Sequence, residues 1–204
     1  MAFTTYTELK SVVADYLART DLTAQIPDFI TLAEVRLKRD LRIRQMLKVA
    51  TATMTVSDST VALPSDFLAI REIHLDTNPA ASLEYLSPSS FFNNAHTTVL
   101  GKPTKYTVIA AEFQFAPIPD SAHTIQILYY ATPTPLSTSV SSNVFLANCP
   151  DLLLYAALGE AEPYLINDAR IQTWAALYDR GLASLSSSDE SSEYAGSPLV
   201  MTTI

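Results

Sequence analysis

The periodicity of apolar side chains changes twice along the chain, and this constrains the fold more than any single motif. Apolar residues recur every three or four positions in residues 5–48 and 150–185, which is typical of amphipathic helices. Residues 49–131 are instead rich in β-branched residues. Within them, Phe113 and Phe115 alternate with polar neighbours, as expected of an antiparallel strand with one buried face. Helices at both ends with strands between them predict an α+β fold, in which the terminal helices meet in one bundle.

The expected domain boundaries follow these changes in pattern. A helical bundle comprises residues 1–48 and 135–188, a β-rich antiparallel insertion comprises residues 49–134, and an extended C-terminal tail comprises residues 189–204. The tail starts with a polar, serine-rich stretch, whose composition is typical of a flexible segment. It ends with the apolar, β-prone residues LVMTTI, which are unusual for a tail in solvent and favour docking on a partner.

Short motifs predict where several helices begin. Thr5 and Glu8 have the spacing of a capping box, which would open the first helix. Ser87, just before a proline, predicts a short helix inside the β-rich insertion. Pro150 suits the first turn of a helix, and Asn167 is expected to cap the last one.

Three helical patterns predict buried faces. In the first helix this face comprises Leu9, Val12, Val13, Tyr16 and Leu17. In the longest pattern, which runs from Pro27 to Lys48, the stripe comprises Ile26, Phe29, Ile30, Ala33, Leu37 and Leu41. In the last helix the face comprises Ile171, Trp174, Ala175, Leu177, Tyr178, Leu182 and Leu185.

The second half of the longest helical pattern concentrates positive charge in an acidic protein. The whole chain has a formal net charge of −8, with 13 basic residues. Six of the basic residues belong to the stretch 36–48, which we call the basic segment: Arg36, Lys38, Arg39, Arg42, Arg44 and Lys48. On a continuous helix, Arg44 and Lys48 would share the azimuth of the apolar stripe. Either the helix leaves its own core after Leu41, or these two cations meet an acidic partner.

No catalytic, cofactor or metal site is predicted. The four glycines are too scattered for a phosphate-binding loop, and the three histidines share no metal-ligand spacing. Glu72 and His74 share a strand face and provide two ligands at most. Cys149 has no histidine near it in sequence, so it is expected to be a small buried residue; a single cysteine also fits a reducing compartment.

No membrane association is expected. No apolar run approaches the roughly 18–20 residues that a membrane span needs. The first ten residues lack the basic and apolar regions of a signal peptide, so we expect the chain to be cytosolic where it is made.

Four segments of the chain resemble the adaptor, or head-to-tail connector, proteins of short-tailed bacteriophages, the tail accessory factor-like family. Two of them are ALPSDFLAIREIHLD and LEYLSPSSFF. The two longer ones contain the motifs IPDFI…AE.RL.RDLR and PDL.LYAAL.EA.P.L..D, which are fairly specific together. The resemblance covers most of residues 4–188 in the expected order.

The resemblance implies both an architecture and an assembly. Its members are helical bundles with a β-rich insertion. They form a ring of twelve copies beneath the portal protein, extend the DNA channel, and provide the platform for a tail tube or nozzle protein. Genomic DNA would pass through this channel without sequence-specific binding, which suits a negatively charged wall. The expected location is the head-tail junction of the virion, after assembly in the host cytoplasm.

This interpretation gives the basic segment and the tail their roles. The basic segment would make subunit or portal contacts, with acidic partners among Glu160, Glu162, Asp168 and Asp179. In related connectors the C-terminal segment reaches the portal, which here points to Pro198, Leu199, Val200, Met201 and Ile204. Two alternatives remain from sequence: a DNA-contacting module that uses a basic helix over 36–48, and, less favoured, a virion-associated cell-wall hydrolase.

Overall fold

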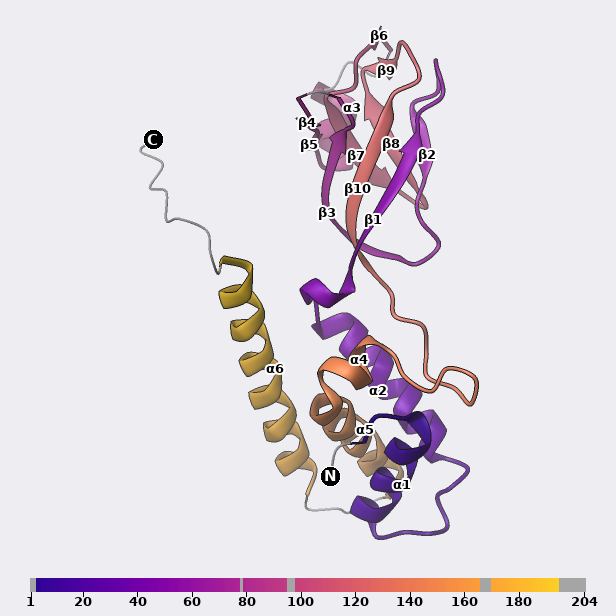
Figure 1. The fold of residues 1–204 in the computed structure, drawn as a ribbon, viewed down its shortest axis with the longest axis vertical. Coiled ribbons are helices and arrows are strands. Elements are labelled where there is room, and N and C mark those ends of the chain that lie inside the picture. Colours follow the sequence, from indigo (N-terminus) through magenta and orange to yellow (C-terminus); the bar gives the residue numbers. More distant parts are fainter. Residues whose placement is uncertain (1–2, 78, 95–97, 166–169, 195–204) are drawn as a thin grey trace. The chain divides into compact units, whose positions relative to one another are not determined.

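The computed structural model describes residues 3–77, 79–94, 98–165 and 170–194 (Figure 1). Two units make up the chain. A helical unit comes from Met1–Met46 and Pro133–Ile204, and a β-rich unit comes from Leu47–Thr132. The fold is α+β, as the sequence predicts. The unit boundaries lie two residues before the ones expected from the change in periodicity.

The helical unit contains five α-helices and one short 3₁₀ turn in the part of the chain that the structure describes. They are α1 (Tyr6–Leu17), α2 (Ile26–Asp40), the 3₁₀ turn η1 (Arg44–Met46), α4 (Val144–Asn148), α5 (Pro150–Leu165) and α6 (Ile171–Tyr194). The predicted capping box opens α1: the side chain of Thr5 accepts a bond from the Glu8 amide, and the Glu8 carboxylate accepts one from the Thr5 amide. Asn167 lies outside the described residues.

Helix α5 is the centre of the helical unit. It packs against α2, α6, α1 and α4, so almost every side of it is covered. Its sequence explains this position, because its apolar residues surround the helix instead of forming one stripe. Its buried residues are Leu152, Leu153, Leu154, Ala156, Ala157, Leu158, Ala161 and Glu162.

The predicted stripe of α2 is buried in full, from Ile26 to Leu41. Other predicted core positions are exposed. Tyr16 is 48% exposed at the edge of α1, although its ring meets Trp174 edge-on. Ile171 is 45% exposed, and Ala175 is also exposed, because α6 contacts the bundle through a narrow face.

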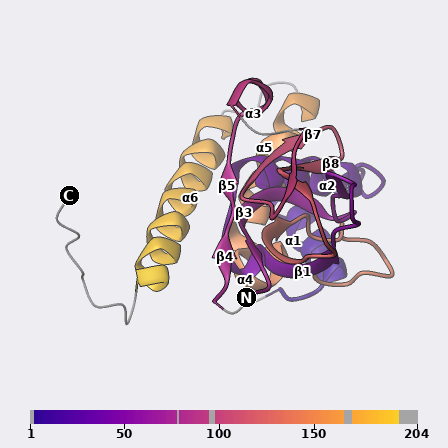
Figure 2. The ribbon, with the colours of Figure 1, turned by 90° about the horizontal axis from the view of Figure 1, so that it is seen from above.

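The ends of α2 and α6 differ from the prediction. Helix α2 ends at Asp40 and not at Lys48, because Leu41 takes an extended conformation (φ −104°, ψ 137°). This break lets the chain bury Leu41 and Ile43 without burying Arg44, which a continued helix would have placed against the core. Helix α6 continues to Tyr194 as one long helix (Figure 2), so the tail predicted to be extended from Asp189 is helical over its first six residues.

The β-rich unit contains ten strands and one short helix among its described residues. They are β1 (Leu47–Thr53), β2 (Thr60–Ala62), β3 (Phe67–Leu75), β4 (Ala81–Ser82), β5 (Glu84–Tyr85), α3 (Pro88–Asn94), β6 (Leu100–Gly101), β7 (Lys105–Ile109), β8 (Glu112–Ala116), β9 (Ile118–Pro119) and β10 (Thr124–Ala131). Helix α3 starts at the predicted position, and the hydroxyl of Ser87 accepts a bond from the Ser90 amide.

Two four-stranded sheets hold the core of this unit. Their strand orders are β1-β10-β3-β4 and β2-β8-β7-β5, and β6 pairs with β9 in a third, two-stranded sheet. The long ladders are antiparallel, as predicted, whereas the short pairs β5-β7 and β6-β9 are parallel. Phe113, Phe115, Ile125 and Ile127 alternate into the core, as the sequence predicts. The reversal between β7 and β8 falls at Ala110, which has a φ of 54°.

Candidate assembly surface of the helical unit

Arg36 is held inside its own subunit. Its guanidinium stacks over the ring of Tyr178, with 4.1 Å between the guanidinium carbon and the ring centre. It also lies 3.8 Å from a carboxylate oxygen of Asp40 and 3.9 Å from one of Glu160. The hydroxyl of Tyr178 donates a bond of 2.7 Å to Asp40. Arg36 therefore joins α2, α5 and α6. Because it is stacked and half-buried, this contact stabilises the fold more than an exposed ion pair does.

Arg44 and Lys48 also have acidic partners in their own subunit. The backbone N–H of Arg44 donates to Asp189 of α6, and its guanidinium lies 3.9 Å from the same carboxylate. Lys48 belongs to the β-rich unit, where its ammonium lies 2.6 Å from Asp66. The hydrogen bonds from Lys48 and from Tyr129 lower the pKa of Asp66 below its ordinary value. The two side chains are 53% and 59% exposed, respectively, so neither is buried.

The remaining three cations of the basic segment lie around the C-terminal end of α2. Arg42 follows the helix, and its guanidinium donates to the carbonyl oxygens of Lys38 and Leu41. A cation at this place stabilises the negative end of the helix. Lys38 is half-buried and Arg39 is exposed, and neither has an ion-pair partner among the described residues.

Two apolar side chains lie on the exposed side of α2, next to these cations. Leu32 is 49% exposed and Val35 is 42% exposed. They are three residues apart, and Arg39 follows Val35 by four, so all three share one side of the helix. This surface was missed from sequence, although both residues lie off the buried stripe and could have been recognised as surplus apolar positions.

The four acids proposed as partners have different surroundings. Glu160 lies beside Arg36 of the same subunit. Glu162 is 1% exposed and accepts a bond of 2.9 Å from the indole N–H of Trp174. Asp168 lies outside the described residues. Asp179 is exposed on α6 and has no ion-pair partner in the described part of the chain, so of the three described acids it best matches the properties expected of an intersubunit acid.

A second buried acid of the helical unit is Glu34, which nothing in the sequence pattern indicated. Its carboxylate accepts bonds from the backbone N–H of Leu136 (3.1 Å) and from the side-chain amide of Asn143 (2.6 Å). The side-chain oxygen Oδ1 of Asn143 in turn accepts a bond from the backbone N–H of Leu146 and so caps α4. Burial raises the pKa of Glu34, although the bonds from Leu136 and Asn143 oppose the shift. Glu34 therefore fixes the loop before α4 to the middle of α2.

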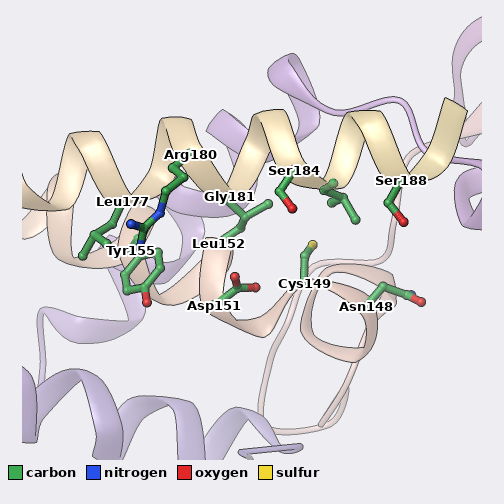
Figure 3. A pocket seen from close by; sticks show the side chains of 11 residues that line it. Asn148, Cys149, Asp151, Leu152, Tyr155, Leu177, Arg180, Gly181, Ser184 and Ser188 are labelled. Carbon is green, nitrogen blue, oxygen red and sulfur yellow. The ribbon is translucent and has the colours of Figure 1, made fainter. Parts of the chain in front are cut away.

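A cavity of about 510 Å³ lies between α6 and the first turn of α5 (Figure 3). Cys149 and Asp151 line it on one side, and Ser184 and Ser188 of α6 line it on the other. Burial, and secondarily Asp151, raises the pKa of the Cys149 thiol to about 12, so the thiol is not activated as a nucleophile. No histidine is among the residues that line the cavity.

Glu72 and His74, the two-ligand fragment noted in the sequence, are each bonded to a polar neighbour of the β-rich unit. Glu72 accepts a bond from Ser82, and His74 is bonded to Gln126. Within the described ranges, no group of three or more metal-binding side chains occurs. None of the described helices is long and apolar enough to cross a bilayer.

Residues 4–202 match the family model described as SU10 adaptor protein. The chain belongs to the SU10 adaptor protein family. No curated protein sequence matches it. The chain is thus a phage adaptor protein, a structural component of the virion at the head-tail junction. This confirms the family that the motifs in α2 and α5 indicated.

The structure of this SU10 adaptor protein does not bring the basic segment together as one helix face. Arg36, Arg44 and Lys48 have partners in their own subunit, and only Lys38 and Arg39 extend from the last turn of α2 without one among the described residues. The tail positions Pro198, Leu199, Val200, Met201 and Ile204 lie outside the described residues. For both sets, a role in subunit or portal contacts stays a prediction.

Proposed function

We propose that this adaptor forms a ring of twelve copies beneath the phage portal. The ring extends the DNA channel and provides the attachment platform for the tail tube or nozzle protein. The observation that carries the proposal is the family match over residues 4–202, which spans both units of the fold. A subunit in such a ring contacts both of its neighbours through different patches, so two distinct exposed surfaces are required on each copy.

The charge of the chain supports a channel that does not retain DNA. Each copy has a formal net charge of −8, and a ring of such subunits repels the phosphate backbone. The competing function, a DNA-contacting basic helix over 36–48, loses its structural basis because α2 ends at Asp40. Three of the six cations in that stretch also face acids of their own subunit.

The adaptor has no enzymatic activity in this proposal. A glycosidase needs two carboxylates about 5–10 Å apart across a substrate site. In the described cavity between α5 and α6, Asp151 is the one carboxylate among the lining residues. The apolar C-terminal residues instead serve assembly by docking on the portal: Pro198, Leu199, Val200, Met201 and Ile204.

The direct experiment mixes the purified adaptor with purified portal rings and images the product by electron microscopy. We expect the full chain to cap one face of the portal with a second ring. A chain that ends at Tyr194 should keep its fold and cap the portal poorly, whereas a matched variant with Thr202→Ala and Thr203→Ala should cap it nearly normally. An adaptor that stays monomeric beside portal rings overturns the proposal.

A mobility-shift titration over a salt series tests the competing function. When the logarithm of the affinity for duplex DNA is plotted against the logarithm of the salt concentration, each phosphate that the protein neutralises makes the slope more negative by about 0.9. We expect no specific complex and a slope near zero. A steep slope that disappears when Lys38 and Arg39 are both changed to Gln would instead assign the end of α2 to DNA.

A further inference from the structure

The exposed side of α2 combines apolar surface with unpaired positive charge. Leu32 and Val35 leave close to half of their surfaces in solvent, and Arg39 is exposed one turn further along. Exposed aliphatic side chains that lie next to each other are characteristic of interaction surfaces. A surface of this composition fits a partner that is apolar opposite Val35 and acidic opposite Arg39.

The exposed side of α6 has the complementary composition. Ala175, Asp179 and Ala183 follow one another at intervals of four residues, so they lie along one side of the helix. All three are exposed, whereas Trp174 and Tyr178, which lie about 100° around α6 from Ala175 and Asp179, are buried against the bundle. This side of α6 therefore presents two small alanine side chains with one carboxylate between them.

The spacing of the two surfaces agrees. Val35 and Arg39 are four residues apart on α2, and so are Ala183 and Asp179 on α6. At 1.5 Å of rise per residue, both pairs span about 6 Å along their helices. When Arg39 lies opposite Asp179, Val35 lies opposite an alanine, whose small side chain leaves room for a close approach. Because Ala175 and Ala183 flank Asp179 on both sides, this match holds for parallel and antiparallel helices.

We propose that the exposed side of α2, formed by Leu32, Val35 and Arg39, docks on the exposed side of α6 of a second copy, with Arg39 paired to Asp179. The two surfaces are different, so the contact is heterologous and repeats from copy to copy until a ring closes. This inference rests on the proposed ring, and it names the residues of one contact between neighbouring subunits. Arg36, by contrast, acts within the subunit.

Charge reversal tests the pairing. Arg39→Asp and Asp179→Arg each place like charges opposite each other. We expect each to raise the subunit concentration at which rings form by at least tenfold, measured by mass photometry with and without portal rings. The double variant pairs the same two charges with their positions exchanged, so it should form rings at a subunit concentration within about threefold of that of the wild type. Lys102→Glu, an equal change of charge at an exposed site in the β-rich unit, is the matched control and should assemble normally. Circular dichroism verifies that every variant is folded.

The outcomes separate this inference from the proposed function. A wild-type chain that never forms rings refutes the proposed function itself. Rings that form equally well from Arg39→Asp, or a double variant that stays as defective as the single ones, overturn the α2-α6 contact and leave the ring intact. Arg39→Asp rings that assemble but no longer cap the portal would also overturn it, because this surface would then face the portal.

Cross-linking gives a second, independent measurement. In the variant with Val35→Cys and Ala183→Cys, oxidation should link neighbours into a ladder of oligomers on a denaturing gel, since each copy carries both halves of the contact. The variant with Val35→Cys and Ala175→Cys tests the opposite helix direction. A ladder with either pair supports the contact, and no ladder with both pairs overturns it. Cys149 is buried and provides no competing thiol in the folded protein.

Discussion

Glu34 gives the sharpest test of how the helical unit is held together. Its residue surface is 8% exposed, and its carboxylate accepts bonds from the N–H of Leu136 and from the amide of Asn143. Glu34→Ala removes both acceptors and leaves a buried N–H without a partner. A hydrogen bond to a charged group contributes about 1.5–3 kcal/mol. Relief from the cost of burying the charge offsets part of this loss, so we expect the free energy of unfolding to fall by about 2–4 kcal/mol.

The same residue produces a defined dependence of stability on pH. Burial raises the pKa of Glu34 above its ordinary value of 4.5, so the folded state holds this proton more tightly than the unfolded state does. The resulting stabilisation is fully present below pH 4.5 and is lost as the pH rises through the folded-state pKa. Glu34→Gln keeps a carbonyl acceptor without a charge. Relative to this variant, the wild type should lose stability as the pH increases.

Urea denaturation at a series of pH values from about 4 to 8 measures both effects. Trp174, the one tryptophan of the chain, is buried in the helical unit, so its fluorescence reports the unfolding of that unit. Glu190→Ala, at an exposed acid of α6, is the control and should change stability by no more than about 0.5 kcal/mol. The reasoning fails if Glu34→Ala unfolds like the wild type, or if the difference between wild type and Glu34→Gln is the same at every pH.

Three further predictions concern packing within the helical unit. Gly181→Ala would place a Cβ atom 2.8 Å from Cδ2 of Leu152. We expect the free energy of unfolding, measured by urea denaturation, to fall by about 1–2 kcal/mol, although alanine has the better helix propensity. A higher free energy of unfolding would show that α6 moves away from Leu152 at no cost. Tyr178→Phe removes the 2.7 Å bond to Asp40 and should cost about 1–2 kcal/mol, measured in the same way; a double variant with Asp40→Asn tests whether the loss belongs to this bond. Cys149 should not react with a thiol reagent at pH 8 until the protein unfolds, because it is 2% exposed and its pKa is raised to about 12; rapid labelling of the native protein would contradict its burial.

Local sequence determined the parts of the fold that could be predicted. The capping box at Thr5, the start of α3 after Ser87 and the alternation of Phe113 with Phe115 each depend on residues only a few positions apart. The buried stripe of α2 is equally local, since side chains return to the same face of a helix every 3.6 residues. The family resemblance also rested on short motifs, chiefly those in α2 and α5, and is confirmed.

Long-range partners determined the parts that could not be predicted. From sequence alone, the basic segment is interpreted as one charged helix, because the sequence does not reveal that Asp189 pairs with Arg44 and that Asp66 pairs with Lys48. Asp189 is 145 residues from Arg44 along the chain, and no periodicity relates the two. Glu34 is a similar case, because an acid in an amphipathic helix is normally solvated, and its partners belong to a loop more than a hundred residues away.

The division of the helical unit into two segments has a consequence for how the subunit is made. Helix α2 leaves the ribosome with its apolar stripe unprotected, because α5, which covers the stripe, starts 110 residues after Asp40, at Pro150. At about 5–20 residues per second, translation imposes a delay on the order of ten seconds. The β-rich unit, Leu47–Thr132, is continuous and can finish folding during this delay. The helical unit is therefore the last part of the subunit to fold. A chain whose synthesis stops before α5 cannot complete this unit and should not enter a ring.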